Sequence, residues 1–104
     1  MDKKYLESSI RMLEFIEKSP TCFHVVENLA EHFESAGFSE LREEETWKIE
    51  AGGRYFVRRN GSSIIAFSVP SEDFENFQIM ATHGDSPAFK IKENPELSVA
   101  DHYV

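Results

Sequence analysis

The sequence lacks the features that mark several large classes of protein. It holds a single cysteine, Cys22, so no disulfide can form within the chain, and this usage fits a reducing compartment. Bases are scarce: 11 Lys and Arg stand against 19 Asp and Glu, a formal net charge of -8. Such a surface repels the phosphates of nucleic acids and of anionic lipids. We therefore expect no nucleic-acid partner and no membrane partner.

Long apolar runs are missing as well. No stretch approaches the roughly 20 apolar residues that span a bilayer. The first ten residues, "MDKKYLESSI", contain no apolar core of a secretory signal, so the cytoplasm is the expected location. With 104 residues, 40% of them hydrophobic, and nine Phe, the chain is large enough for one small packed domain.

Two amphipathic helices are predicted in the first third of the chain. Apolar residues recur at helical spacing over 5–17, on one face: Leu6, Ile10, Leu13 and Ile16. Ser19 and Pro20 are typical of the N-cap and the first residue of a second helix, which would run to about Ala36. Gly37 is the expected stop. The inward face of the second helix would carry Phe23, Val26, Leu29, Ala30 and Phe33.

The apolar period changes to two after Gly37, which indicates strands. "FSELREEETWKIE" is a weak strand region, and Gly52-Gly53 is a turn signal. "RYFVRR" and "SSIIAFSV" flank Asn60-Gly61, which predicts a β-hairpin because both central residues of a type I′ turn need positive φ. "FQIMAT", residues 77–82, favours a buried central strand. After a turn at Asn94-Pro95, "ELSVADHYV" starts what we expect to be another strand.

The expected strand over 77–82 ends at His83-Gly84-Asp85, which has the chemistry of a metal site. A neutral imidazole is a good zinc ligand, and a carboxylate close in sequence can hold the other ring N–H. The same residues, followed by Ser86, also suit an ordinary turn. One His and one Asp cannot complete a zinc site, which needs about three to four protein ligands. His24 could be buried or at an interface, and the sequence leaves its role open.

Three segments together resemble one known family. "SPTCFHVVENLAEHFESAGFSEL", "GGRYFVRRNGSSIIAF" and "ATHGDSPAFKIKENPEL" follow in the order and spacing seen at the N-terminus of the M18, or aspartyl, aminopeptidases. The resemblance covers about residues 6–104. It implies a cytoplasmic enzyme with two zinc ions, which hydrolyses peptides with metal-activated water and removes N-terminal, acidic residues. It also implies a homo-oligomer, commonly a dodecamer.

The resemblance assigns roles to two residues of this chain. His83 would be the first zinc ligand, and Asp85 the catalytic-site acid that orients it. Gly84 stands where the family usually has Ser, a small change that leaves both neighbours intact. The family's other ligands and its glutamate base have no counterpart within 104 residues. At most one zinc ligand is therefore present here, and the 104-residue chain alone is expected to be inactive.

The implied fold class is α/β: the N-terminal part of a zinc-exopeptidase-like catalytic domain, with two helices, then mixed strands with a β-hairpin, and incomplete. Residues 1–93 would belong to the catalytic domain, and residues 94–104 would start the connection into a β-rich inserted domain. Two other hypotheses stay open on the sequence. The chain could be a natural 104-residue non-enzymatic assembly or binding module, or part of a zinc peptidase or deacylase of another family.

Overall fold

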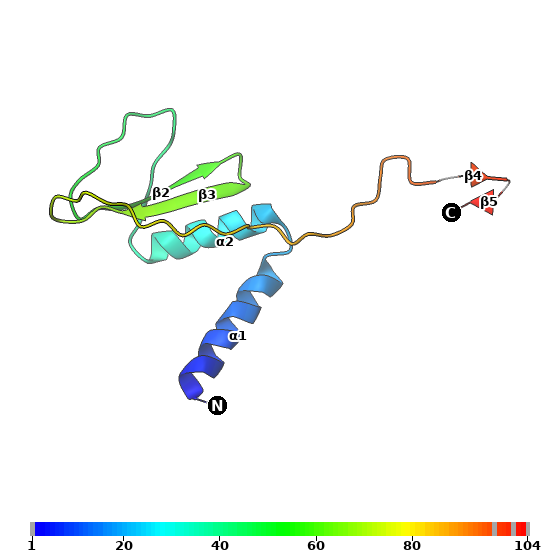
Figure 1. Ribbon diagram of the computed structural model, residues 1–104, viewed down its shortest axis with the longest axis horizontal. Helices are drawn as coiled ribbons and strands as arrows, with labels where there is room; N and C mark the ends of the chain where they lie inside the picture. The colour runs from blue at the N-terminus through cyan, green and yellow to red at the C-terminus, as the bar shows by residue number, and fades with distance from the viewer. Residues whose placement is uncertain (1, 97, 101, 104) are drawn as a thin grey trace.

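The architecture consists of two helices followed by a small mixed sheet, as the sequence predicted (Figure 1). The structure, a computed structural model, describes residues 2–96, 98–100 and 102–103. In chain order the elements are α1 (Lys3–Lys18), α2 (Cys22–Ser35), β1 (Ser39–Glu40), β2 (Arg54–Arg59), β3 (Ser63–Ser68), β4 (Ser98–Val99) and β5 (His102–Tyr103). Strands β4 and β5 pair with each other in the region where a further strand was expected; residues 97, 101 and 104 lie outside the described residues.

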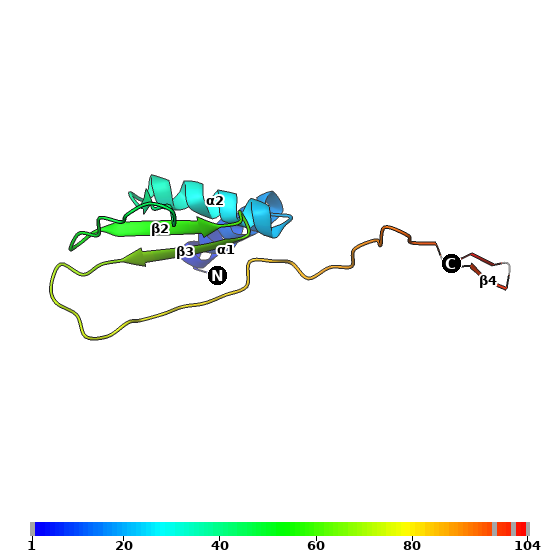
Figure 2. The same ribbon diagram turned by 90° about the horizontal axis from the view of Figure 1, so that it is seen from above.

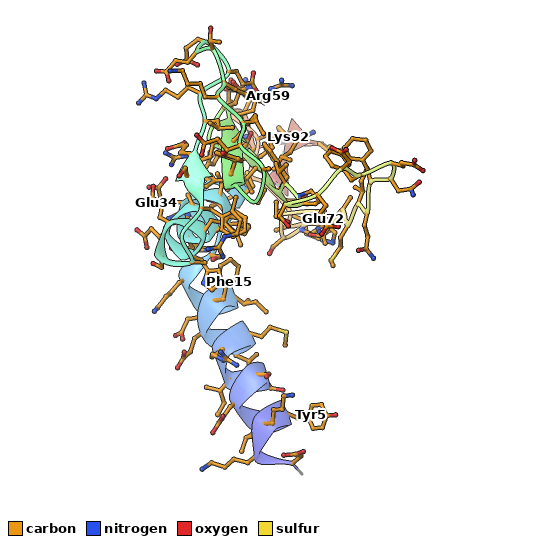
Figure 3. The ribbon with its side chains drawn as sticks, turned by 90° about the vertical axis from the view of Figure 1, so that its left-hand side faces the viewer. Tyr5, Phe15, Glu34, Arg59, Glu72 and Lys92 are labelled. Atoms are coloured by element: carbon orange, nitrogen blue, oxygen red, sulfur yellow. The ribbon has the colours of Figure 1, made fainter. Side chains whose placement is uncertain are left out.

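Helix α1 forms where it was predicted, but it stands away from the sheet (Figure 1). The Asp2 carboxylate caps its N-terminus by accepting a hydrogen bond from the Lys4 N–H at 3.1 Å. Its side chains project into open space along the helix from Tyr5 toward Phe15 (Figure 3). The predicted apolar stripe is consequently exposed: Leu6 48%, Ile10 46%, Leu13 60% and Ile16 56%.

Helix α2 begins two residues later than predicted, because Thr21 and not Ser19 is its N-cap. The Thr21 hydroxyl accepts a hydrogen bond from the His24 N–H at 3.4 Å. Ser19 serves the preceding junction instead: its N–H bonds the Ile16 carbonyl, and its buried hydroxyl accepts from the Asn28 side chain at 3.0 Å. The N–H and the hydroxyl of Ser19 are thus both hydrogen-bonded at this junction, and the Thr21 hydroxyl caps α2 instead.

The predicted stop at Gly37 is confirmed. Gly37 has φ +83°, a conformation that costs glycine little. The N–H groups of Gly37 and Phe38 bond the carbonyls of Glu34 and Phe33, each at 2.9 Å. These two bonds form a Schellman motif, which satisfies carbonyls that the helix end leaves free.

The core lies between α2 and one face of the sheet (Figure 2). Phe56 of β2 is 0% exposed, and its ring centroid lies 6.0 Å from that of Phe33 on α2. Val26 and Ala30 are buried beside it, as expected from helical spacing. Phe23 was predicted to face inward but is 59% exposed. It lies beside the hairpin turn, where the sheet ends and no longer covers the helix.

The sheet has the order β1-β2-β3, with β1 parallel and β3 antiparallel to β2. The hairpin turn has the predicted geometry: φ is +53° at Asn60 and +65° at Gly61, and the Ser62 N–H bonds the Arg59 carbonyl at 3.2 Å. The weak strand region contributes only β1, and the residues after it form a loop.

The predicted central strand over 77–82 is wrong for the chain as described. These residues carry no strand assignment, and Ile79 and Met80 are 84% and 90% exposed. A strand exists only as part of a ladder, and neither edge of the β1-β2-β3 sheet bonds this segment. The apolar composition of residues 77–82 suits a central strand, but none of the described strands pairs with this segment.

One charged cluster ties three elements together. The Arg58 guanidinium on β2 bonds both carboxylate oxygens of Glu40 on β1, with Nε–Oε1 2.6 Å and Nη2–Oε2 3.0 Å. Its Nη1 bonds Glu27 of α2 at 3.1 Å. The hydrogen bond from Arg58 is the main reason that the pKa of Glu40 is lowered from its ordinary value. This cluster links α2 to the sheet through the exposed Glu27 carboxylate.

The cluster predicts a pH dependence of stability. A carboxyl whose pKa is lower in the folded state stabilises the fold above its unfolded pKa, about 4.3 for Glu. That stabilisation is lost as the pH falls through the folded pKa. We expect Glu40→Gln to lower the melting temperature at neutral pH and to flatten its decline on acidification, measured by circular dichroism. An unchanged acid slope would contradict the assignment to Glu40.

Candidate metal centre

His83 and Asp85 meet through the imidazole Nδ1. This atom lies 2.9 Å from the Asp85 carbonyl oxygen and 3.1 Å from Asp85 Oδ1. Both neighbours can only accept a hydrogen bond, so Nδ1 carries the proton and donates it to them. The local sequence explains this geometry. Asp85 follows His83 after one residue, Gly84, so its carboxylate can fold back to the imidazole ring.

The tautomer with the proton on Nδ1 leaves His83 able to bind zinc through Nε2. With the proton on Nδ1, the lone pair of His83 lies on Nε2, and neutral imidazole Nε2 is a common zinc-binding atom. The His83 side chain is 77% exposed and that of Asp85 61%, so Nε2 is accessible. The pair therefore fits a zinc ligand and its orienting carboxylate. That His83 binds zinc stays a prediction.

No cluster of potential ligands in the described part of the chain completes the site. Over residues 2–96, 98–100 and 102–103, no three His, Cys, Asp or Glu side chains lie close enough to hold an ion together. His24, whose role the sequence left open, lies with its Nδ1 2.7 Å from the Thr21 hydroxyl and so belongs to the α2 cap.

The segment that carries His83 passes the first turn of α2. A methyl group placed on Gly84 would lie 3.5 Å from Cγ1 of Val25, an ordinary van der Waals distance. On the same turn, a methyl group on Gly61 would lie 3.7 Å from the Phe23 ring. Sequence reasoning did not select Val25, because it is off the predicted inward face and no local pattern links residues 25 and 84.

Within the residues that the structure describes, no helix has both the length and the apolar character that crossing a bilayer requires.

Comparison with known families decides the family of this chain. The family model "Aminopeptidase I zinc metalloprotease (M18)" matches residues 15–104. The chain belongs to the M18 family. The resemblance stated from its three segments is thereby confirmed, and the alternative of a zinc peptidase or deacylase from another family is wrong. The family's description supports zinc as the metal in general terms.

The names of similar proteins agree with this family assignment. It is 40% identical over 104 residues to "Probable M18 family aminopeptidase 2" of Clostridium novyi, covering 98% of this chain and 24% of the relative. It is 47% identical over 94 residues to "Aspartyl aminopeptidase 1" of Schizosaccharomyces pombe, covering 86% of this chain and 20% of the relative. The chain thus spans a quarter or less of the length of these aminopeptidases, which are hydrolases.

Solved M18 structures share the fold. A chain in the cryo-EM structure of the Ape4 and Nbr1 complex matches with a TM-score of 0.76 and 45% identity, over 90% of this chain and 19% of that one. Yeast aminopeptidase 1 (Ape1) matches with a TM-score of 0.55 and 32% identity, over 60% of this chain and 15% of that one. The predicted fold class, two helices followed by mixed strands with a hairpin, is confirmed.

Proposed function

We propose that this chain is the N-terminal part of a dinuclear zinc aminopeptidase that removes N-terminal, acidic residues from peptides. The hydrogen bond from His83 Nδ1 to Asp85 carries the proposal, since it leaves Nε2 ready for a metal within a segment that matches an M18 zinc metalloprotease. The relative named aspartyl aminopeptidase supports the acidic preference. Peptides with a free N-terminus are the substrate class.

His83 would hold one zinc ion through Nε2. Asp85 would keep the Nδ1 proton in place, fix the ring plane and raise the basicity of the ligand. Zinc, when bound, supplies a Lewis acid for peptide hydrolysis. The other ligands and the proton-transferring base would come from parts of the enzyme beyond residue 104, so the 104-residue chain alone would be inactive.

The same proposal covers domain organisation and assembly. Residues 1–93 would belong to the catalytic domain, and residues 94–104 would lead into a β-rich inserted domain. The enzyme would work in the cytoplasm as a homo-oligomer, a dodecamer by resemblance. The exposed apolar stripe of α1 supports an interface with another part of the assembly, because so many large apolar side chains on one helix face are costly in water.

The test begins with the protein as its source cell makes it, captured with an antibody to residues 1–104. We expect an intact mass several times 12.0 kDa. The captured protein should hydrolyse peptides with N-terminal Asp or Glu, lose this activity to a chelator and regain it with zinc. A mass near 12.0 kDa without hydrolysis would favour the non-enzymatic module instead.

Asp85→Ala should weaken zinc binding in the complete enzyme. Loss of a ligand's hydrogen-bond partner typically costs about 10- to 100-fold in affinity or activity. We expect roughly 10-fold, the lower end of that range, because the Asp85 carbonyl oxygen still accepts from Nδ1. Zinc affinity measured by chelator competition tests this, with Asp85→Asn as the matched variant that keeps an acceptor oxygen. Normal affinity and turnover in Asp85→Ala would refute the role.

A further inference from the structure

We infer that Asn60 is a site of spontaneous covalent modification: its side-chain amide is hydrolysed through a cyclic intermediate formed with the backbone nitrogen of Gly61. The two residues form the hairpin turn between β2 and β3, with φ +53° and +65°. The pair that suits this turn also joins a side-chain amide to a following residue that has no side chain to obstruct the reaction. Water is the only other reactant.

The reaction is a hydrolysis with no change of oxidation state. The Gly61 nitrogen gives up its proton to hydroxide and attacks Cγ of Asn60. The Cγ–Nδ2 bond breaks, ammonia leaves, and a cyclic imide (succinimide) closes. Water then opens the ring at either of its two carbonyls. Opening at Cγ gives aspartate at position 60, whereas opening at the main-chain carbonyl gives isoaspartate, in which the main chain runs through Cβ and Cγ.

The turn leaves the attacking nitrogen unoccupied. It is closed by the Ser62 N–H, which bonds the Arg59 carbonyl at 3.2 Å. Among the backbone hydrogen bonds of the described turns and loops, none uses the Gly61 N–H. Because Gly61 lacks Cβ, the rotation that brings its nitrogen toward Cγ of Asn60 meets no side chain of its own residue. The pair therefore has both the reacting groups and the freedom to bring them together.

The other three asparagines of the chain lack this combination. Asn28 lies within α2, and its Nδ2 donates to two groups at the junction with α1, each at 3.0 Å. Asn94 precedes Pro95, which has no N–H to give up. Asn76 precedes Phe77, whose large side chain obstructs the approach of its nitrogen. The Asn-Gly pair of the hairpin is therefore expected to react first.

The two products differ in what they do to the hairpin. Aspartate at position 60 keeps the main chain unchanged, and Asp-Gly also suits a type I′ turn. Isoaspartate lengthens the main chain between the Cα of residue 60 and the Gly61 nitrogen. The bond from Ser62 to the Arg59 carbonyl and the adjacent pairing of Arg59 with Ser63 then lose their register. Isoaspartate should therefore loosen the turn end of β2 and β3.

The experiment ages the complete enzyme at neutral and alkaline pH and quantifies aspartate and isoaspartate at every asparagine by peptide mapping with mass spectrometry. A synthetic peptide of residues 54–68, aged alongside, sets the time needed for full conversion. We expect both products at position 60 before any other position, at a rate that rises in proportion to hydroxide, because the attacking nitrogen must lose its proton. Earlier conversion of another asparagine, or an Asn60 still intact when the peptide is fully converted, would overturn the inference.

Two variants separate the chemistry from the stability of the hairpin. Gly61→Ala places a methyl group beside the attacking nitrogen and should slow the conversion several-fold, although φ +65° strains alanine. Asn60→Gly removes the amide and still suits the turn, so it is the matched control. After ageing it should keep the hydrogen-exchange protection of β2 and β3, whereas the unsubstituted enzyme should lose part of it. Equal losses in the two aged proteins would show that modification of Asn60 does not loosen the hairpin and would overturn that consequence.

Discussion

His83→Ala in the complete enzyme should abolish tight zinc binding at one of the two proposed metal positions and reduce peptide hydrolysis to near background. The substitution removes a ligand itself and not a partner of the ligand, so we expect a loss greater than the roughly 100-fold upper range for hydrogen-bond partners of ligands. Zinc per protein after dialysis, measured by mass spectrometry, and hydrolysis of an N-terminal Asp peptide give the two readouts.

The control for this variant is His32→Ala. His32 is an exposed histidine near the end of α2, and the same change in volume and titratable charge occurs there. It should keep normal zinc content and turnover. If His83→Ala retained both zinc ions at unchanged affinity, the metal-binding role of His83 would be wrong, whatever happened to the activity.

The elements that local interactions determine were the ones that the sequence predicted well. The hairpin follows from Asn60-Gly61, because few other pairs adopt positive φ at both positions. The end of α2 follows from Gly37 for the same conformational reason. The start of α2 was predicted two residues too early, because the Ser19 hydroxyl that was expected to cap it accepts a hydrogen bond from the Asn28 side chain instead.

The elements that depend on distant partners could not be predicted in this way. The composition of 77–82 is that of a central strand, but a strand needs neighbours that composition does not provide. The pairing of His83 with Asp85 was foreseen because it spans two residues. The segment around Gly84 passes close to Val25, 59 positions earlier in the chain, and nothing local in the sequence indicates this proximity.

Phe56 occupies the one position in the described residues where a large side chain is completely buried. It projects from β2 against α2, where the Phe33 ring lies 6.0 Å away and Val26 and Ala30 close the space around the helix. Because interiors pack as densely as organic crystals, the surrounding side chains can collapse only partly into a hole left there. Phe56 therefore anchors the packing of α2 against β2.

Phe56→Ala should destabilise this part of the protein by about 3–5 kcal/mol, the usual cost of truncating a buried phenylalanine. In the complete enzyme we expect faster amide hydrogen exchange across α2 and β2, measured by mass spectrometry, and a lower melting temperature. Phe56→Leu should show a smaller change of both, since leucine refills most of the volume. Unchanged protection of α2 in Phe56→Ala would mean that the contact between α2 and β2 does not hold the helix in place.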